Sequence, residues 1–240
     1  MNKYIVAVDD GHGLNTNGKM SPDGYKENEF NHWTKEYLIE ELKFNGFKIV
    51  DCSPDRKDNS LSDRCKREKA GKSDIFISIH FNAMGNTWQK GASGIETYYH
   101  GGSKNGKKLA KAVHYELLKG TKLNNRGVKS DKTLYTNGLY VLRHTASPAI
   151  LVECGFMDNE YDVKLMKSKA YRKECAKEIC KGICKYFDVK YKDKDAIDPD
   201  AELIKLTKII SPKYYNVWVD HFKKNKDLNW LGFLQSALKK

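Results

Sequence analysis

The sequence lacks long hydrophobic runs. The longest uninterrupted apolar stretch in its 240 residues, residues 4–8, has five, whereas a helix that spans a bilayer needs about 20. The same stretch is shorter than the roughly 7–15 apolar residues of a signal peptide, and it ends in Asp9 and Asp10. We therefore exclude a transmembrane segment and expect synthesis in the cytoplasm without an export signal.

The sequence also lacks Cys-x-x-Cys pairs, although it contains six cysteines. A cytoplasmic origin argues against a disulfide framework. We interpret all six as small, buried apolar side chains rather than as metal ligands or redox groups. They are Cys52, Cys65, Cys154, Cys175, Cys180 and Cys184.

Acidic residues are too few to balance the basic ones. The 43 Lys and Arg residues against 31 Asp and Glu residues give a net charge of +12, which attracts polyanions such as nucleic acid, anionic lipid or teichoic acid. The lysines are spread along the chain instead of being clustered with aromatic residues, so we do not expect nucleic acid as a partner. A hydrophobic content of 40% is enough for a packed core and excludes wholesale disorder.

Strand-like and helix-like patterns alternate through residues 1–188, which we take as one domain. Apolar or β-branched runs predict strands, and apolar residues at helical spacing predict helices. The predicted strands cover residues 4–8, 47–50, 75–79, 94–99 and 148–152, and the predicted helices cover residues 28–45, 60–69, 107–118 and 171–187. This alternation is typical of an α/β protein with an open, mostly parallel, twisted sheet flanked by helices.

The composition changes after residue 188. Residues 189–200 are mostly charged and include Pro199, which predicts a linker. Residues 201–240 show only helical spacing of apolar side chains and predict a small all-helical C-terminal module. Because about 40 residues make a thin core, we expect these helices to pack on the larger domain, to self-associate or to bind another molecule.

Three predicted strands lead into side chains with ligand or acid/base chemistry. His12, His80 and Glu153 each follow such a strand, and the carboxyl ends of parallel strands converge at one edge of a sheet. Two imidazoles and a carboxylate can form a zinc site whose fourth position is open to water. Two carboxylates are then needed, one to bind the ion and one to accept and donate protons. Glu153 is one of them. The other is Glu27, with Glu29 as the alternative, near the start of the first predicted helix.

These residues lie in motifs that resemble those of the zinc-dependent N-acetylmuramoyl-L-alanine amidases with an open α/β sheet. The resemblance covers about residues 1–188, and the motifs follow the family's order. They are Val8-Asp9-Asp10-Gly11-His12-Gly13, Gly24-Tyr25-Lys26-Glu27-Asn28-Glu29, Leu61-Ser62-Asp63-Arg64, Phe76-Ile77-Ser78-Ile79-His80-Phe81-Asn82-Ala83, Asn125-Arg126-Gly127-Val128 and Pro148-Ala149-Ile150-Leu151-Val152-Glu153-Cys154-Gly155-Phe156.

The resemblance implies a role for each matched position. His12, Glu27 and His80 are expected to bind Zn²⁺, Glu153 to be the catalytic carboxylate, and Asn82 to lie near the substrate.

Three further positions carry expectations of their own. Arg64 is expected to be a structural ion-pair partner. Asp10 and Phe81 depart from the family's usual small residue and alanine, and we expect both to reshape the rim of the groove.

The implied reaction is hydrolysis of the amide between N-acetylmuramic acid and L-alanine in the peptidoglycan of a Gram-positive wall. The absence of an export signal suits two origins, a phage endolysin released through a holin pore and a mother-cell enzyme of sporulation. We favour the endolysin because the chain is compact and carries an appended C-terminal module. The Lys- and Asn-rich composition suggests a clostridial host. The alternatives are a mother-cell lytic amidase of sporulation, another zinc amide hydrolase acting on the wall, and an inactive wall-binding relative. The C-terminal helices would bind the wall or mediate self-association.

Overall fold

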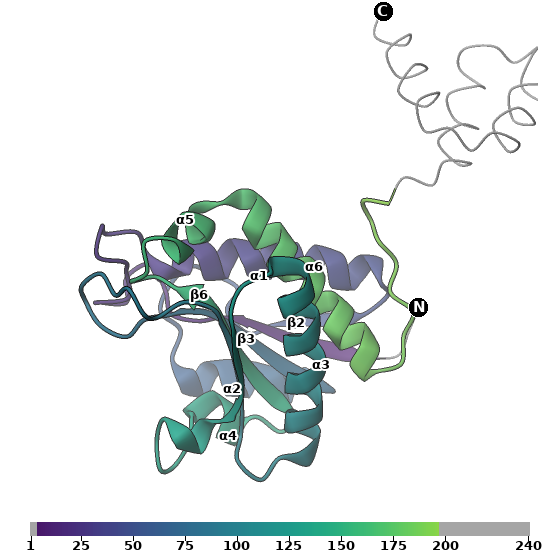
Figure 1. Ribbon diagram of the computed structural model, residues 1–240. Coiled ribbons are helices and arrows are strands. Elements are labelled where there is room, and N and C mark those ends of the chain that lie inside the picture. Colours follow the sequence, from purple (N-terminus) through teal and green to yellow (C-terminus); the bar gives the residue numbers. More distant parts are fainter. Residues whose placement is uncertain (1–3, 197–240) are drawn as a thin grey trace, which may run out of the picture. The chain divides into compact units, whose positions relative to one another are not determined.

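The computed structural model describes residues 4–196 and contains one six-stranded sheet in the order β2-β1-β3-β6-β4-β5 (Figure 1). Its strands are β1 (Ile5–Asp10), β2 (Lys48–Asp51), β3 (Ile75–Asn82), β4 (Ile95–Tyr99), β5 (Asn125–Ser130) and β6 (Ala149–Phe156). Neighbouring strands are parallel except β4 and β6, which are antiparallel. The predicted α/β class with an open, mostly parallel sheet is confirmed.

Helices cover both faces of this sheet. They are α1 (Glu27–Phe44), α2 (Leu61–Ala70), α3 (Lys104–Thr121), α4 (Tyr140–His144), α5 (Asp162–Lys167) and α6 (Lys169–Tyr186), with a 3₁₀ turn η1 (Asp131–Thr133). Helices α1, α3 and α6 lie on one face, and α2 and α4 lie on the other (Figure 1). Within residues 4–196, no helix has both the length and the apolar character needed to cross a bilayer.

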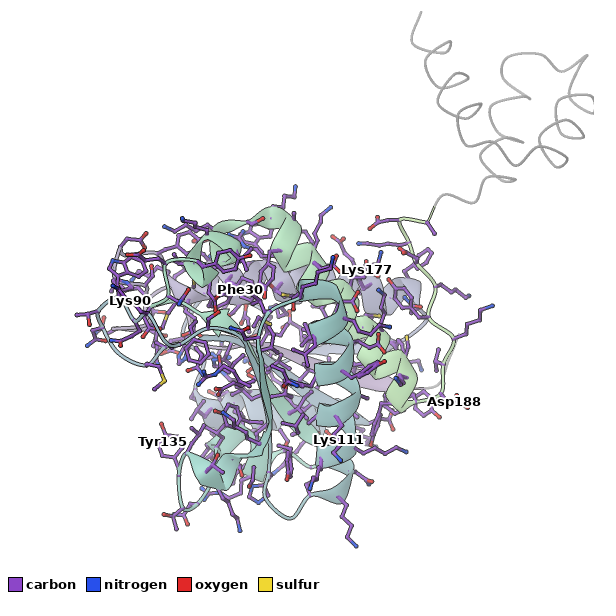
Figure 2. The ribbon with its side chains drawn as sticks, viewed as in Figure 1. Phe30, Lys90, Lys111, Tyr135, Lys177 and Asp188 are labelled. Carbon is purple, nitrogen blue, oxygen red and sulfur yellow. The ribbon has the colours of Figure 1, made fainter. Side chains whose placement is uncertain are left out.

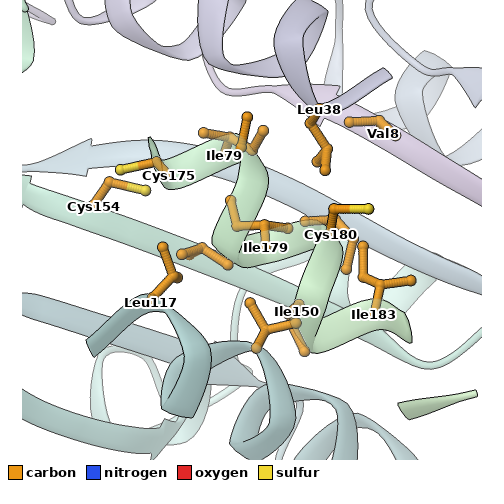
Figure 3. Close-up of a cluster of buried hydrophobic side chains, with 14 of the residues drawn as sticks. Val8, Leu38, Ile79, Leu117, Ile150, Cys154, Cys175, Ile179, Cys180 and Ile183 are labelled. Atoms are coloured by element: carbon orange, nitrogen blue, oxygen red, sulfur yellow. The ribbon is translucent and has the colours of Figure 1, made fainter. Parts of the chain in front are cut away.

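The larger core lies between the sheet and helices α1, α3 and α6. In Figure 3, Ile79 of β3 and Ile150 of β6 lie among side chains of α6, including Ile179 and Ile183. A smaller core on the opposite face contains residues such as Phe76. Burial on both faces explains the nearly continuous apolar runs of the central strands. All six cysteines lie among the described residues, where they are buried and form no disulfide, as predicted.

Strands β3 and β6 extend further than their apolar runs predicted. Backbone pairing continues past residues 79 and 152, with His80 opposite Glu153 and Asn82 opposite Phe156. The strands therefore end at residues 82 and 156, because the backbone ladder does not require apolar side chains. His80 and Glu153 therefore lie inside their strands, near the carboxyl ends, and not after them.

The chain divides into two compact units between Lys192 and Asp193. Tyr191 donates its hydroxyl hydrogen to Glu41 Oε2 at 3.0 Å, and the Lys192 amide donates to Asn45 Oδ1 at 2.7 Å. The first residues of the predicted linker 189–200 thus pack beside the end of α1. The predicted module, residues 201–240, lies outside the described residues.

Candidate metal centre and catalytic site

His12 is held by the loop that follows β1. The Gly11 amide donates to the Ile79 carbonyl at 2.9 Å, and Asn28 Nδ2 donates to the His12 carbonyl at 3.0 Å. His12 has a φ of 63°, a left-handed conformation that is uncommon outside glycine. A Cβ atom at Gly11 would lie 2.0 Å from Cε1 of His80. Glycine is therefore needed where the loop crosses the second histidine.

Glu27 is the first residue of α1, one position earlier than the predicted helix start. Its buried carboxylate accepts hydrogen bonds at Oε1 from Asn31 Nδ2 at 3.0 Å and from the Phe81 amide at 3.1 Å. The rival carboxylate, Glu29, instead pairs with Arg56 at 2.8 Å and is partly exposed. The structure thus brings Glu27, and not Glu29, to the histidines.

Three potential ligand atoms converge at the carboxyl edge of the sheet. His80 Nδ1 lies 3.1 Å from Glu27 Oε1, and His12 Nε2 lies 3.5 Å from Glu27 Oε2. The two imidazole rings are 5.1 Å apart at nearly a right angle. One donor atom from each residue lies within 4.8 Å of the others. Two imidazoles and one carboxylate are a donor set typical of catalytic zinc, with one position left for water or substrate.

Glu153 faces this cluster from β6. It is the register partner of His80, and its Oε2 atom is buried without a hydrogen-bond partner among the described residues. Burial raises the pKa of Glu153 to about 8, and the charges of Glu27 and Glu96 add to this rise while His80 opposes it. Buried polar atoms nearly always have a partner. An unpaired carboxyl oxygen beside three converging ligands is therefore suited to hold a metal-bound water or a proton.

Two of the three potential ligands, His12 and Glu27, have the protonation states that metal binding requires. For His80, burial favours a lower pKa, but the hydrogen bond with Glu27 and the charge of Glu27 raise the pKa. Burial lowers the pKa of His12 to about 4, although Glu27 opposes this shift. For Glu27, burial favours a higher pKa, but the hydrogen bond with His80 and the charges of both histidines lower it to about 2. At neutral pH His12 is neutral and Glu27 is ionised, as ligands must be.

A cavity of about 590 Å³ opens above these residues. His80 and Glu153 lie among its lining residues, together with Lys19 of the loop before α1. Exposed apolar side chains also line it, namely Leu61, Leu134 and Tyr135. Tyr135 is 62% exposed, and Figure 2 shows it at the edge of the molecule. The cavity therefore combines a polar catalytic floor with an apolar rim.

Asn82 lies in the same cavity, at the end of β3. Its Oδ1 atom accepts a hydrogen bond from the Ala83 amide at 2.8 Å, and its Nδ2 atom lies 3.4 Å from Glu96 Oε2. This position is compatible with the predicted role of Asn82 near the substrate, which stays a prediction.

Sequence reasoning missed a buried acid next to Glu153. Glu96 of β4 is the register partner of Glu153, and it accepts hydrogen bonds from Arg126 at 2.5 Å, from Lys129 at 3.0 Å and from the Tyr98 hydroxyl. Arg126 belongs to a motif that the sequence highlighted. The contact between Arg126 and Glu96 depends on the pairing of β4 with β5, which no local sequence pattern predicts.

Asp10 does not line the cavity, so the expectation that it reshapes the rim was wrong, whereas Phe81 is among the lining residues although its side chain is buried. Asp10 is buried, with Oδ2 3.1 Å from His32 Nδ1 and 3.5 Å from Lys35 Nζ. The Phe81 ring packs on Phe30 with ring centroids 4.7 Å apart. Both side chains are covered by α1, because their strand positions point toward that helix.

Comparison with known proteins identifies the family. A family model described as N-acetylmuramoyl-L-alanine amidase matches residues 6–185, and the chain belongs to this family. The open α/β sheet, and the His, Glu and His side chains that could hold a metal ion, agree with this family. The protein is accordingly an enzyme of cell-wall cleavage, an N-acetylmuramoyl-L-alanine amidase.

Individual relatives agree with this assignment. The N-acetylmuramoyl-L-alanine amidase CwlM of Bacillus licheniformis is 30% identical over 188 residues, covering 77% of this chain and 69% of CwlM. The endolysin of Bacillus phage SPP1 is 31% identical over 135 residues, covering 55% of this chain and 47% of the endolysin. The crystal structure of an N-acetylmuramoyl-L-alanine amidase from Clostridium difficile 630 is similar with a TM-score of 0.71 and 31% identity, covering 79% of this chain and all of that one.

Proposed function

We propose that this amidase is zinc-dependent and that His12, Glu27 and His80 hold the ion. The observation that carries the proposal is the convergence of their three donor atoms within 4.8 Å, opposite the unpaired Oε2 atom of Glu153. The scissile bond is the amide between the lactyl group of N-acetylmuramic acid and L-alanine of the stem peptide.

Glu153 acts as the general base and then the general acid. Bound zinc would supply a water of lowered pKa and would polarise the carbonyl oxygen. Glu153 accepts a proton from the water as its oxygen attacks the carbonyl carbon. It then donates a proton to the L-alanine nitrogen as the C–N bond breaks, which leaves a carboxyl group on the lactyl side and a free amine on the peptide. In the metal-free chain burial raises the pKa of Glu153 to about 8, which favours the proton-donating step, whereas a bound cation would lower this pKa and favour the proton-accepting step.

The apolar rim supports a large, extended substrate. Leu61, Leu134 and Tyr135 line the cavity with exposed apolar surface, and Asn82 adds an amide beside Glu96. Flat aromatic faces and aliphatic side chains bind the apolar faces of sugar rings, whereas an amide can bind peptide groups. We assign the rim to the glycan and Asn82 to the neighbourhood of the scissile peptide.

The activity is tested on purified Gram-positive cell walls. The expected products carry a newly exposed L-alanine amino terminus, found by mass spectrometry of the released fragments. A chelator is expected to abolish the release, and added Zn²⁺ to restore it. A different new amino terminus would indicate another zinc amide hydrolase. A metal content near zero, with wall binding retained, would indicate an inactive wall-binding relative.

We also propose a lytic role for the chain, as a phage endolysin made in the cytoplasm that meets the wall only after the membrane opens. The similarity to the SPP1 endolysin supports this role. Expressed in a Gram-positive cell, the chain should leave the culture intact until a pore-forming agent is added. Lysis without that agent would contradict the proposal. Activity restricted to sporulating cells would instead favour the mother-cell amidase.

For residues 201–240 we propose wall binding, with self-association as the alternative. Sedimentation with purified walls is expected to be weaker for a chain that lacks residues 195–240 than for the full chain. Equal sedimentation of the two would rule out wall binding. A change in oligomeric state alone would favour self-association.

A further inference from the structure

A chain of buried hydrogen bonds runs beneath His80. Ser78 precedes His80 by two positions on β3, so both side chains point to the same face of the sheet. Ser78 Oγ lies 3.2 Å from His80 Nε2 and donates its hydrogen to Asp9 Oδ2 at 2.7 Å. Asp9 is the register partner of Ser78 on β1, and the three groups thus form a continuous line.

Arg64 closes the far end of this line. Its Nη1 atom lies 2.6 Å from Asp9 Oδ1, and its Nε atom donates to the Asn59 carbonyl at 3.0 Å. This confirms Arg64 as the structural ion-pair partner that the sequence predicted. Arginine only donates, so Asp9 Oδ1 accepts from Arg64, while Oδ2 accepts the hydrogen of Ser78. Asp9, Ser78 and the Arg64 side chain are almost fully buried, so water does not compete for these hydrogen bonds.

The direction of these hydrogen bonds determines which nitrogen of His80 carries the hydrogen. Ser78 has one hydroxyl hydrogen, and Asp9 accepts it. Ser78 Oγ can therefore only accept from His80, which places the imidazole hydrogen on Nε2. Nδ1 is the atom that lies 3.1 Å from Glu27 Oε1 in the ligand cluster, and without a metal it can donate a hydrogen to that ionised carboxylate. A metal ion would take the place of the hydrogen on Nδ1, while the hydrogen on Nε2 would stay directed at Ser78.

We propose that Asp9 and Ser78 are positioning residues that fix the tautomer and the ring orientation of His80, so that Nδ1 is the metal-binding atom. This inference rests on the proposed zinc dependence. Histidine ligands generally need such a partner on their second nitrogen, and losing it weakens metal binding by about 10–100-fold. His12 differs, because no hydrogen bond to its Nδ1 is made within residues 4–196.

The test compares Ser78→Ala with a matched variant, Thr97→Val. Thr97 is also a buried hydroxyl next to a histidine, 3.0 Å from His114 Nδ1, but it does not line the cavity. Zinc affinity is measured by competition with a chromophoric chelator. Ser78→Ala should bind zinc about 10–100-fold more weakly than wild type, whereas Thr97→Val should bind zinc as wild type does.

A spectroscopic readout separates positioning from a loss of stability. In zinc-loaded protein labelled with ¹⁵N-histidine, His80 should show a metal-bound Nδ1 and an Nε2 hydrogen that exchanges slowly with water. In Ser78→Ala that hydrogen should exchange quickly. A zinc-bound Nε2 atom in wild type, or a Ser78→Ala variant with unchanged affinity and exchange, overturns the inference and leaves the proposed function standing. A wild-type chain that binds no zinc overturns the proposed function itself.

Discussion

The strand residues at the floor of the cavity and the loops around the cavity are supported differently. His80 and Glu153 lie opposite each other on two central parallel strands, and their neighbours in those strands are buried. His12, in contrast, sits on a loop with a left-handed backbone, and Tyr135 sits on a loop with its ring largely exposed. Neighbouring strands on both sides support His80 and Glu153. The His12 loop is held by hydrogen bonds to Ile79 and Asn28, whereas the side chain of Tyr135 is exposed.

The loop that carries Tyr135 is anchored at its base and open at its tip. Buried Asp131 accepts hydrogen bonds from the Gly101 amide at 2.9 Å and from the Leu139 amide at 3.0 Å. Gly138 has a φ of +72°, and a Cβ atom there would lie 2.3 Å from Asp131 Oδ2. The floor of the cavity and the loops around it thus differ in how firmly their backbone is held. We therefore expect changes in the floor to alter catalysis more than changes in the rim.

The largest effect is expected at His80. His80→Ala removes a proposed zinc ligand on the floor of the cavity, and we expect loss of both zinc and wall-degrading activity, down to the background of the assay. Metal content by mass spectrometry and turbidity of a wall suspension measure the two effects. A variant that retains full zinc and activity would exclude His80 from the metal site.

Glu153→Gln is expected to separate proton transfer from metal binding. The amide keeps the shape of the carboxylate but cannot act as a general acid or base. We therefore expect kcat to fall by about 10²–10⁴-fold while the zinc content stays near that of wild type. Kinetics on a soluble muramyl peptide, together with metal analysis, test this. Full activity in Glu153→Gln would refute its role as the acid and base.

Gly11→Ala tests the contact between the loop that carries His12 and the His80 ring on the floor of the cavity. The new Cβ atom would lie 2.0 Å from Cε1 of His80, so the loop or the imidazole must move. We expect a loss of unfolding free energy of about 1–3 kcal/mol, measured by urea unfolding, together with weaker zinc binding. Gly91→Ala is the control, since a Cβ atom at Gly91 has no neighbour within 4 Å. Equal effects of the two substitutions would show that the contact is not tight.

The raised pKa of Glu153 predicts a pH dependence of stability in the metal-free protein. Its pKa is about 8 in the folded chain against a reference value of 4.5. Between these values the folded state keeps a proton that the unfolded state releases, so stability falls as pH rises. Relative to Glu153→Gln, metal-free wild type should unfold at progressively lower temperature across this window. A constant difference between the two melting temperatures would contradict the prediction.

The smallest effect is expected at the rim. Tyr135→Ala removes exposed apolar surface that we propose binds the substrate equally in its ground and transition states, so KM on intact walls should rise about 2–10-fold with kcat unchanged. Tyr115→Ala is the matched control, because Tyr115 is also exposed, at 53%, but lies on α3 outside the cavity lining. A fall in kcat for Tyr135→Ala would mean that the loop carrying Tyr135 also positions His80 and Glu153.

The fold was predictable where side-chain patterns are strong. The apolar runs that became β3 and β6 and the amphipathic pattern that became α3 all indicated their elements. Strand β5 was missed because Asn125–Ser130 is a polar, half-buried edge strand with no apolar run. The five-residue helix α4 is too short to show helical periodicity.

The residue types of the candidate site were readable from the chain itself, because an imidazole or a carboxylate after a buried strand is chemically distinctive and its neighbouring motifs are local. The partners of those residues were not. Ser78 meets Asp9, and Glu96 meets Glu153, only through strand register. Register depends on how distant segments pair and pack in three dimensions, and hydrogen-bond direction follows from that pairing. The sequence by itself therefore determined the candidate ligands and the general acid/base, while the tertiary structure decided which atoms face one another.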